Sequence, residues 1–242
     1  MNQEEKKAHI LFLEDDETLA FVTADSLRSK GFEVSHFSNG EEALNAFKTD
    51  GFDICILDVM VPGMDGFEVA EKIRETDVQV PVLFLTARSM QEDRIQGLSI
   101  GGDDYITKPF SIDELVLRMK IFLKRRNVDT NETESNGALE IGKYRLDHNN
   151  LVLVFDGIEQ KLTMTESELL KLFFLNKNQV LKREDILISV WGDDSLYLSR
   201  SLDVFISRLR KLLSKDKKIS LKNMRSVGFV LRYGGRGSGY GG

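Results

Sequence analysis

The sequence is poor in residues that build covalent cross-links and soft metal sites. Its 242 residues include one cysteine and three histidines. A single cysteine, Cys55, excludes an intramolecular disulfide and a zinc site made of several thiolates. No apolar run approaches the roughly 20 residues that a membrane span needs, and the opening MNQEEKKAHI lacks the apolar stretch of a signal peptide. We therefore expect a cytoplasmic protein with no membrane partner.

Charge is abundant but unevenly distributed. Residues 1–126 carry 15 basic against 24 acidic residues, whereas residues 138–233 carry 17 basic against 12 acidic residues. Residues 127–137 hold turn formers, three acids and no base, which is typical of a flexible linker. Because a basic surface attracts nucleic acid and an acidic one repels it, we expect two domains with different partners. The Gly-rich residues 234–242 are expected to be disordered.

Residues 8–126 alternate short apolar runs with amphipathic segments. The runs are typical of buried strands and lie at 10–13, 32–37, 53–57, 81–85 and 105–107. The segments between and after them predict helices at 17–30, 41–48, 67–75, 88–100 and 111–126. Five strand–helix repeats predict an α/β domain with a doubly wound, five-stranded parallel sheet of the flavodoxin-like order 2-1-3-4-5.

Residues 138–233 follow a different rhythm. Short alternating segments between Leu139 and Thr163 predict an antiparallel meander. A capping box at Thr165-x-x-Glu168 opens the first of three helices, followed by helices at 183–191 and 200–214. Strands at 219–224 and 229–233 form a closing hairpin. This order predicts an α+β winged helix-turn-helix domain.

Five polar side chains follow predicted strands in the first domain. They are Glu14, Asp15, Asp58, Thr86 and Lys108. The carboxyl ends of parallel strands form the edge where such sheets bind ligands. Three carboxylates in one place need a cation, and Mg²⁺ suits oxygen ligands while leaving room for a phosphoryl group. The pattern predicts phosphoryl transfer onto Asp58, whereas Asp16 is expected only to cap the next helix.

Residues 8–126 resemble the receiver domain of two-component response regulators. The matching stretches are ILFLEDD, ILDVMVPGMDGFEV, PVLFLTAR and DRIQGLSIGGDDYITKPFSIDEL. The resemblance implies that a sensor histidine kinase phosphorylates Asp58 and that Lys108 pairs with the phosphoryl group. It implies a cis Lys108–Pro109 bond. It also implies that Thr86 and Tyr105 are switch residues: Thr86 moves toward the phosphate and the ring of Tyr105 turns inward. The implied ligands of Mg²⁺ are Glu14, Asp15, Asp58 and the backbone carbonyl of Met60.

The last of those stretches is similar to the OmpR/PhoB subfamily, whose receivers dimerise through the fourth helix, fifth strand and fifth helix. The implied ion pairs between subunits are Arg94 with Glu114, Asp104 with Arg118, and Asp103 with Arg125, around an apolar patch of Ile95, Leu98 and Val116. Exposed ion pairs contribute about 0–1 kcal/mol each, so the patch must supply much of the affinity. Gly102 stands where the subfamily usually has alanine, which is expected to loosen the loop without abolishing the interface.

The helix predicted at 200–214 has one apolar and one basic face. At 100° per residue the basic face holds Arg200, Ser201, Val204, Arg208, Lys211 and Lys215. Such a face alone is usually a solvated surface, but here it lies in a basic domain before a basic hairpin. It suits a DNA major groove, where an arginine side chain contacts guanine and a valine side chain contacts the thymine methyl group. The other basic side chains would contact phosphates.

The second domain resembles the winged-helix output domain of the same OmpR/PhoB family, through LTMTESELL, VWGDD, SRSLDVFISRLRKLL and MRSVGFVL. The resemblance implies that Arg225, in the wing, enters the neighbouring minor groove. Ser226 stands at the turn of the wing where the family commonly has glycine. The implied protein is a phosphorylation-dependent homodimer on tandem half-sites in double-stranded DNA. The linker would permit the two DNA-binding domains to bind head-to-tail beneath a two-fold receiver pair. The only catalysis implied is the receiver's own phosphoryl transfer and slow dephosphorylation.

Two other functions stay open at this point. A metal-dependent phosphatase would use Asp58 as a turnover nucleophile, but such enzymes commonly place a second acid two residues later, where this chain has Met60. A constitutive DNA-binding protein would carry an inert receiver, but the complete set of acids, threonine and lysine argues against it. Reaction with acetyl phosphate and Mg²⁺ separates the three functions.

Overall fold

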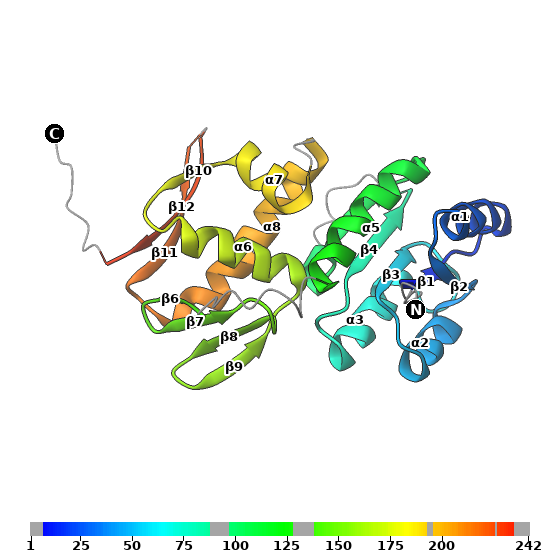
Figure 1. Ribbon diagram of the computed structural model, residues 1–242, viewed down its shortest axis with the longest axis horizontal. Helices are drawn as coiled ribbons and strands as arrows, with labels where there is room; N and C mark the ends of the chain where they lie inside the picture. Colours follow the sequence, from blue (N-terminus) through cyan, green and yellow to red (C-terminus); the bar gives the residue numbers. More distant parts are fainter. Residues whose placement is uncertain (1–6, 88–96, 128–137, 193–195, 226, 235–242) are drawn as a thin grey trace, which may run out of the picture. The chain divides into compact units, whose positions relative to one another are not determined.

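A computed structural model describes residues 7–87, 97–127, 138–192, 196–225 and 227–234, with side chains left out at 125–127 and 196–200. The chain divides into two compact units, Met1–Asn131 and Glu132–Gly242 (Figure 1). The predicted linker and tail lie mostly outside the described residues, although helix α5 continues to Asn127. No helix of the described chain is both long enough and apolar enough to cross a membrane.

The first unit is a parallel five-stranded sheet in the order β2-β1-β3-β4-β5, which confirms the predicted topology. Its strands are β1 (His9–Leu13), β2 (Glu33–Phe37), β3 (Ile54–Asp58), β4 (Val82–Thr86) and β5 (Asp104–Thr107). Its helices are α1 (Glu17–Ser29), α2 (Gly40–Thr49), α3 (Gly66–Thr76) and α5 (Ile112–Asn127). Of the helix predicted at 88–100, residues 97–100 are helical and residues 88–96 lie outside the described part.

The sheet is buried on both faces, as its continuous apolar strands require. Helices α2 and α3 pack on one face and α1 and α5 on the other (Figure 1). Helix α3 begins directly against the end of β3. The approach is so close that a Cβ atom at Gly66 would clash with the carbonyl oxygen of Asp58. A glycine here therefore shapes the backbone that follows the predicted nucleophile.

The second unit begins with the predicted antiparallel meander, now seen as β6 (Leu139–Ile141), β7 (Tyr144–Asp147), β8 (Val152–Phe155) and β9 (Ile158–Lys161). Three helices follow: α6 (Met164–Leu175), α7 (Arg183–Trp191) and α8 (Leu196–Leu212), which continues as a 3-10 turn over Leu213–Lys215. A second sheet joins β10 (Val180–Lys182) to the hairpin β11 (Ile219–Met224) and β12 (Gly228–Tyr233). The winged-helix prediction is confirmed, although β10 was not predicted.

The capping box of α6 lies two residues before the predicted one. The amide of Glu166 donates to the Thr163 hydroxyl at 3.3 Å, and the Thr163 amide donates to the Glu166 carboxylate at 2.9 Å. Both Thr163 and Thr165 precede a glutamate by three residues, so the motif alone does not choose between them. Thr165 is fully buried inside the first turn instead.

Candidate phosphoacceptor site and DNA-contacting helix

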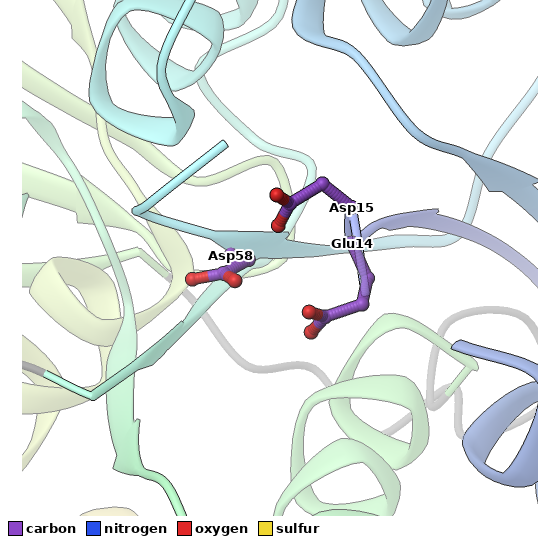
Figure 2. A group of neighbouring side chains, drawn as sticks. All are labelled: Glu14, Asp15 and Asp58. Atoms are coloured by element: carbon purple, nitrogen blue, oxygen red, sulfur yellow. The ribbon is translucent and has the colours of Figure 1, made fainter. Parts of the chain in front are cut away.

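Three acids meet at the carboxyl edge of the first sheet, as predicted. Glu14 and Asp15 follow β1, and Asp58 ends the neighbouring strand β3 (Figure 2). One carboxylate oxygen from each lies within 4.8 Å of the others. Glu14 and Asp58 are buried and Asp15 is exposed. The group therefore combines two buried acids with one that is exposed to solvent.

Lys108 supplies the positive charge at this site. Its Nζ lies 2.6 Å from Glu14 Oε2 and 2.6 Å from Asp58 Oδ2. Burial alone lowers the pKa of Lys108, but its hydrogen bonds and charge interactions with both carboxylates outweigh this and raise the pKa above its usual value. Burial raises the pKa of Glu14, and the Lys108 hydrogen bond opposes this rise without cancelling it. Lys108 is thus held as a permanent cation between the two acids.

The two oxygens of Asp58 have different partners. Oδ1 accepts a hydrogen bond from the Met60 amide at 3.0 Å, and Oδ2 faces Lys108. Asp16, in contrast, accepts from the amides of Thr18 and Leu19, each at 2.9 Å, and so caps α1 as predicted. Asp58 therefore belongs to the acidic site, whereas Asp16 serves the start of α1.

Thr86 and Tyr105 lie on adjacent strands. Thr86 is fully buried at the end of β4, and Tyr105 is buried in β5. The ring centroid of Tyr105 lies 5.6 Å from that of Phe84, so the tyrosine ring already packs inward against β4. The Lys108–Pro109 bond is cis, which confirms that prediction.

Known proteins share both units. Residues 10–120 match the family described as response regulator receiver domain, and residues 157–231 match transcriptional regulatory protein, C terminal. The transcriptional regulatory protein RprY of Bacteroides fragilis is 39% identical over 227 residues, covering 94% of this chain and 95% of RprY. The sensory transduction protein RegX3 of Mycobacterium tuberculosis is 38% identical, covering 92% and 98%.

Solved structures also match this chain over nearly its whole length. A RitR mutant matches with a TM-score of 0.72 at 25% identity over 94% of this chain and all of that one. Response regulator DrrB, an OmpR/PhoB homolog from Thermotoga maritima, matches with a TM-score of 0.50 at 29% identity over 93% and 99%. The chain is a response regulator of the OmpR/PhoB type. The predicted pairing of a receiver with a DNA-binding transcription regulator is thereby confirmed.

Charged residues of the predicted dimer face of this response regulator form ion pairs within one chain. Arg118 Nη1 lies 2.9 Å from Asp104 Oδ2, and Arg118 Nη2 lies 3.1 Å from Glu114 Oε1. Asp103 is fully buried and bonds Arg74 at 3.0 Å and the amide of Val82 at 3.1 Å. The pairing of Asp103 with Arg125 of another subunit stays a prediction, and it requires Asp103 to exchange its partners within the chain.

Two members of the predicted apolar patch are also covered within the chain. Leu98 is fully buried and Val116 nearly so, because both face the receiver core rather than solvent. Among the described side chains of α5, Leu117 is an exposed apolar one, at 57% exposure, and the sequence analysis did not single it out. Arg94 and Ile95 lie outside the described residues, and so does the side chain of Arg125.

The predicted DNA-contacting face of α8 is only partly exposed in this response regulator. Lys211 and Lys215 are exposed, Val204 and Arg208 are half-buried, and Ser201 is fully buried. The exposed residues that the helical wheel missed are Asp203, Ser207 and Arg210. Arg225 is exposed at the turn between β11 and β12, whereas Ser226 and the side chain of Arg200 lie outside the described part.

Proposed function

We propose that this response regulator accepts a phosphoryl group on Asp58 from a partner sensor histidine kinase. The observation that carries the proposal is the position of Lys108 Nζ, 2.6 Å from both Glu14 and Asp58. That arrangement holds a cation beside the carboxylate that is to attack, where it neutralises an arriving phosphate. The remaining proposed partners are a second copy of the chain and tandem half-sites in double-stranded DNA, in the cytoplasm.

The chain's own groups orient the transfer. Met60 donates its amide to Asp58 Oδ1, which leaves Oδ2 directed toward Lys108 as the attacking oxygen. A bond forms between Oδ2 and phosphorus as the bond from phosphorus to the donor nitrogen breaks. Lys108 then pairs with the phosphoryl oxygens, and the Thr86 hydroxyl moves to hydrogen-bond one of them. Beyond this transfer and slow hydrolysis of the acyl phosphate, we assign no turnover.

The site fits a hard divalent cation. Glu14, Asp15 and Asp58 bring three carboxylates within 4.8 Å, and the ammonium of Lys108 balances only one of their charges. All three offer oxygen, the donor atom that Mg²⁺ prefers. These acids, with the Met60 carbonyl, would hold Mg²⁺, which supplies charge neutralisation for the entering phosphoryl group.

The test is intact-mass measurement of the full chain after incubation with acetyl phosphate and Mg²⁺. A stable gain of one phosphoryl group that disappears with chelator and in Asp58→Asn supports the proposal. Rapid release of phosphate without an accumulated adduct indicates the phosphatase alternative. No reaction with acetyl phosphate or with small phosphoramidates indicates an inert receiver on a constitutive DNA-binding protein.

A further inference from the structure

The backbone carbonyl of Glu14 is held by a side chain rather than by the sheet. In the ladder between β1 and β2, the Glu14 amide donates to the Phe37 carbonyl at 3.0 Å. Strand β2 ends at Phe37, and Asn39, whose amide would continue the ladder, caps α2 instead. The His36 side chain takes the place of that amide, because its ring atom Nε2 lies 2.8 Å from the Glu14 carbonyl oxygen.

The ring of His36 is the donor of this hydrogen bond. A carbonyl oxygen only accepts, so the hydrogen is on Nε2. The ring is half-buried, and its centroid lies 5.7 Å from that of Phe12, the residue opposite it on β1. Because Phe12 is fully buried, this contact limits how far the His36 ring can turn away. His36 therefore directs a well-placed donor at the backbone of the acidic site.

The bonded carbonyl belongs to the peptide unit that joins Glu14 to Asp15. A peptide unit is planar and contains the Cα atoms of both residues, so its orientation decides the direction in which both side chains leave the backbone. These side chains carry two of the three carboxylates that lie near one another at this site (Figure 2). Asp15 is exposed, so the position of its carboxylate depends on the backbone more than on packing. A turn of this peptide unit moves both carboxylates relative to Asp58.

We propose that His36 is a positioning residue for phosphoryl transfer, which by holding the Glu14 carbonyl sets the orientation of Glu14 and Asp15 toward a divalent cation. This role rests on the proposed function of the acidic site, and His36 itself touches neither the cation nor the phosphoryl group. Groups that orient metal ligands in this way typically contribute about 10–100-fold to metal affinity. Loss of the donor frees the peptide unit to turn, while the carboxylate of Asp58 stays in place.

Two substitutions separate the donor from the ring. His36→Phe keeps a ring beside Phe12 and removes the donor, whereas His36→Gln keeps an N–H donor and removes the ring. The first measurement is binding of Mn²⁺ alone to the full chain, followed by loss of the free-ion signal in electron paramagnetic resonance, because Mn²⁺ takes oxygen ligands as Mg²⁺ does. His36→Phe is expected to weaken Mn²⁺ binding about tenfold, and His36→Gln to stay within about threefold of the wild type.

The second measurement is the rate of phosphoryl incorporation from acetyl phosphate at a series of Mg²⁺ concentrations. The half-saturating Mg²⁺ concentration is expected to rise about tenfold in His36→Phe, while the rate at saturating Mg²⁺ changes by less than about threefold. The effects divide in this way because the substitution leaves Asp58 and Lys108 unchanged. A histidine with a merely structural role would alter stability without altering the half-saturating concentration.

His9 provides the matched control. It is also half-buried, its Nδ1 lies 3.0 Å from the Gly51 carbonyl oxygen, and its ring centroid lies 4.3 Å from that of Phe52. It lies at the amino end of β1, whereas the acidic site follows the carboxyl end. His9→Phe is therefore expected to lower the free energy of unfolding while the Mn²⁺ affinity stays at the wild-type value. Urea unfolding without metal, followed by circular dichroism, measures the stability of every variant.

The outcomes separate the positioning role from the proposed function. Wild-type Mn²⁺ affinity in folded His36→Phe overturns the role of His36, and so does an equal loss of affinity in His36→Gln or in His9→Phe; the proposed function then stands. If His36→Phe does not fold, His36→Leu takes its place, since it also removes the donor. A wild type that binds Mn²⁺ but takes no phosphoryl group overturns the proposed function, and the Mn²⁺ comparison still decides the role of His36. A wild type that binds no Mn²⁺ overturns the role of His36.

Discussion

Arg118 and Asp104 form an ion pair inside a single receiver, with 2.9 Å between Arg118 Nη1 and Asp104 Oδ2 and almost no exposure of either side chain. Burial alone lowers the pKa of Arg118, but the Asp104 and Glu114 carboxylates raise it overall, so the charge is permanent. The pair that the sequence analysis placed between two subunits thus joins β5 to α5 within one subunit. A dimer that uses it must exchange the bond rather than create it.

Arg118→Ala is expected to destabilise the receiver by about 3–5 kcal/mol, because it leaves the buried Asp104 carboxylate without its cation. Urea unfolding followed by circular dichroism measures the change. The matched control is Glu114→Ala, which removes an exposed partner of the same arginine and is expected to cost about 1 kcal/mol or less. Equal unfolding midpoints for wild type and Arg118→Ala would contradict the expectation.

Glu114→Ala is the cleaner test of the proposed dimer face, because it leaves the Arg118–Asp104 pair in place. We expect it to weaken phosphorylation-dependent dimerisation while phosphoryl incorporation continues. Sedimentation of acetyl phosphate-treated chain over a concentration series gives the dimer affinity, and intact mass gives the incorporation. An unchanged dimer affinity at full phosphorylation would remove Glu114 from the interface.

Asp58→Asn is expected to abolish phosphoryl incorporation, whereas Asp16→Asn is expected to retain most of it. An asparagine in place of Asp58 lacks the nucleophilic carboxylate, while asparagine caps a helix about as well as aspartate does. Intact mass after reaction with acetyl phosphate and Mg²⁺ reports both. Labelling of the Asp58 variant at the wild-type level would show that the phosphoryl group goes elsewhere.

Strands β1, β3 and β4 were predictable because each is an apolar run that ends at a polar residue. The strand order was predictable because five strand–helix repeats indicate the flavodoxin-like class. Asp58 and Lys108 could be placed at one edge for the same reason, since parallel strands share a carboxyl edge. The direct contact of Lys108 with both acids was not predictable, because it depends on how far the loop after β5 carries the side chain across the sheet.

The errors concern the rotation of helices. The helical wheel places Arg208 on the outer basic face, and the resemblance places Val116 in a dimer patch, whereas Arg208 is half-buried and Val116 is buried. Neither burial can be foreseen without knowing what packs against the helix. Arg208 is drawn inward by Glu166, a charge 42 residues earlier in the chain. Local spacing carries no information about such a partner.

Tyr144→Phe is expected to destabilise the second domain by about 1–3 kcal/mol near neutral pH. The Tyr144 hydroxyl donates to the Leu212 carbonyl at 2.9 Å and accepts from the Lys215 amide at 3.2 Å, so its loss leaves both groups at the end of α8 unpaired. Urea unfolding monitored through Trp191 measures the difference. A difference near zero would mean that water replaces the hydroxyl fully.

The same pair of proteins tests a pH effect. Burial raises the pKa of Tyr144 above its usual value near 10. A group whose pKa is raised in the folded state contributes its full stability below the unfolded pKa and loses it as pH rises through the folded pKa. The stability advantage of wild type over Tyr144→Phe is therefore expected to shrink above about pH 10. A constant difference from pH 8 to pH 11 would contradict this.

Gly102→Ala restores the residue that the subfamily usually has, yet it is expected to destabilise this receiver by about 1–3 kcal/mol through overpacking. The new Cβ would lie 2.6 Å from the Phe84 ring, which is fully buried and held between Phe67 and Tyr105. The glycine is thus matched to the large residue on β4, which corrects the expectation that it only loosens the loop. Phe84→Leu removes the obstructing ring, so the double variant is expected to be more stable than the sum of the two single losses predicts. Urea unfolding of all four proteins gives the coupling, and strictly additive losses would show that Gly102 serves the loop backbone rather than the space beside Phe84.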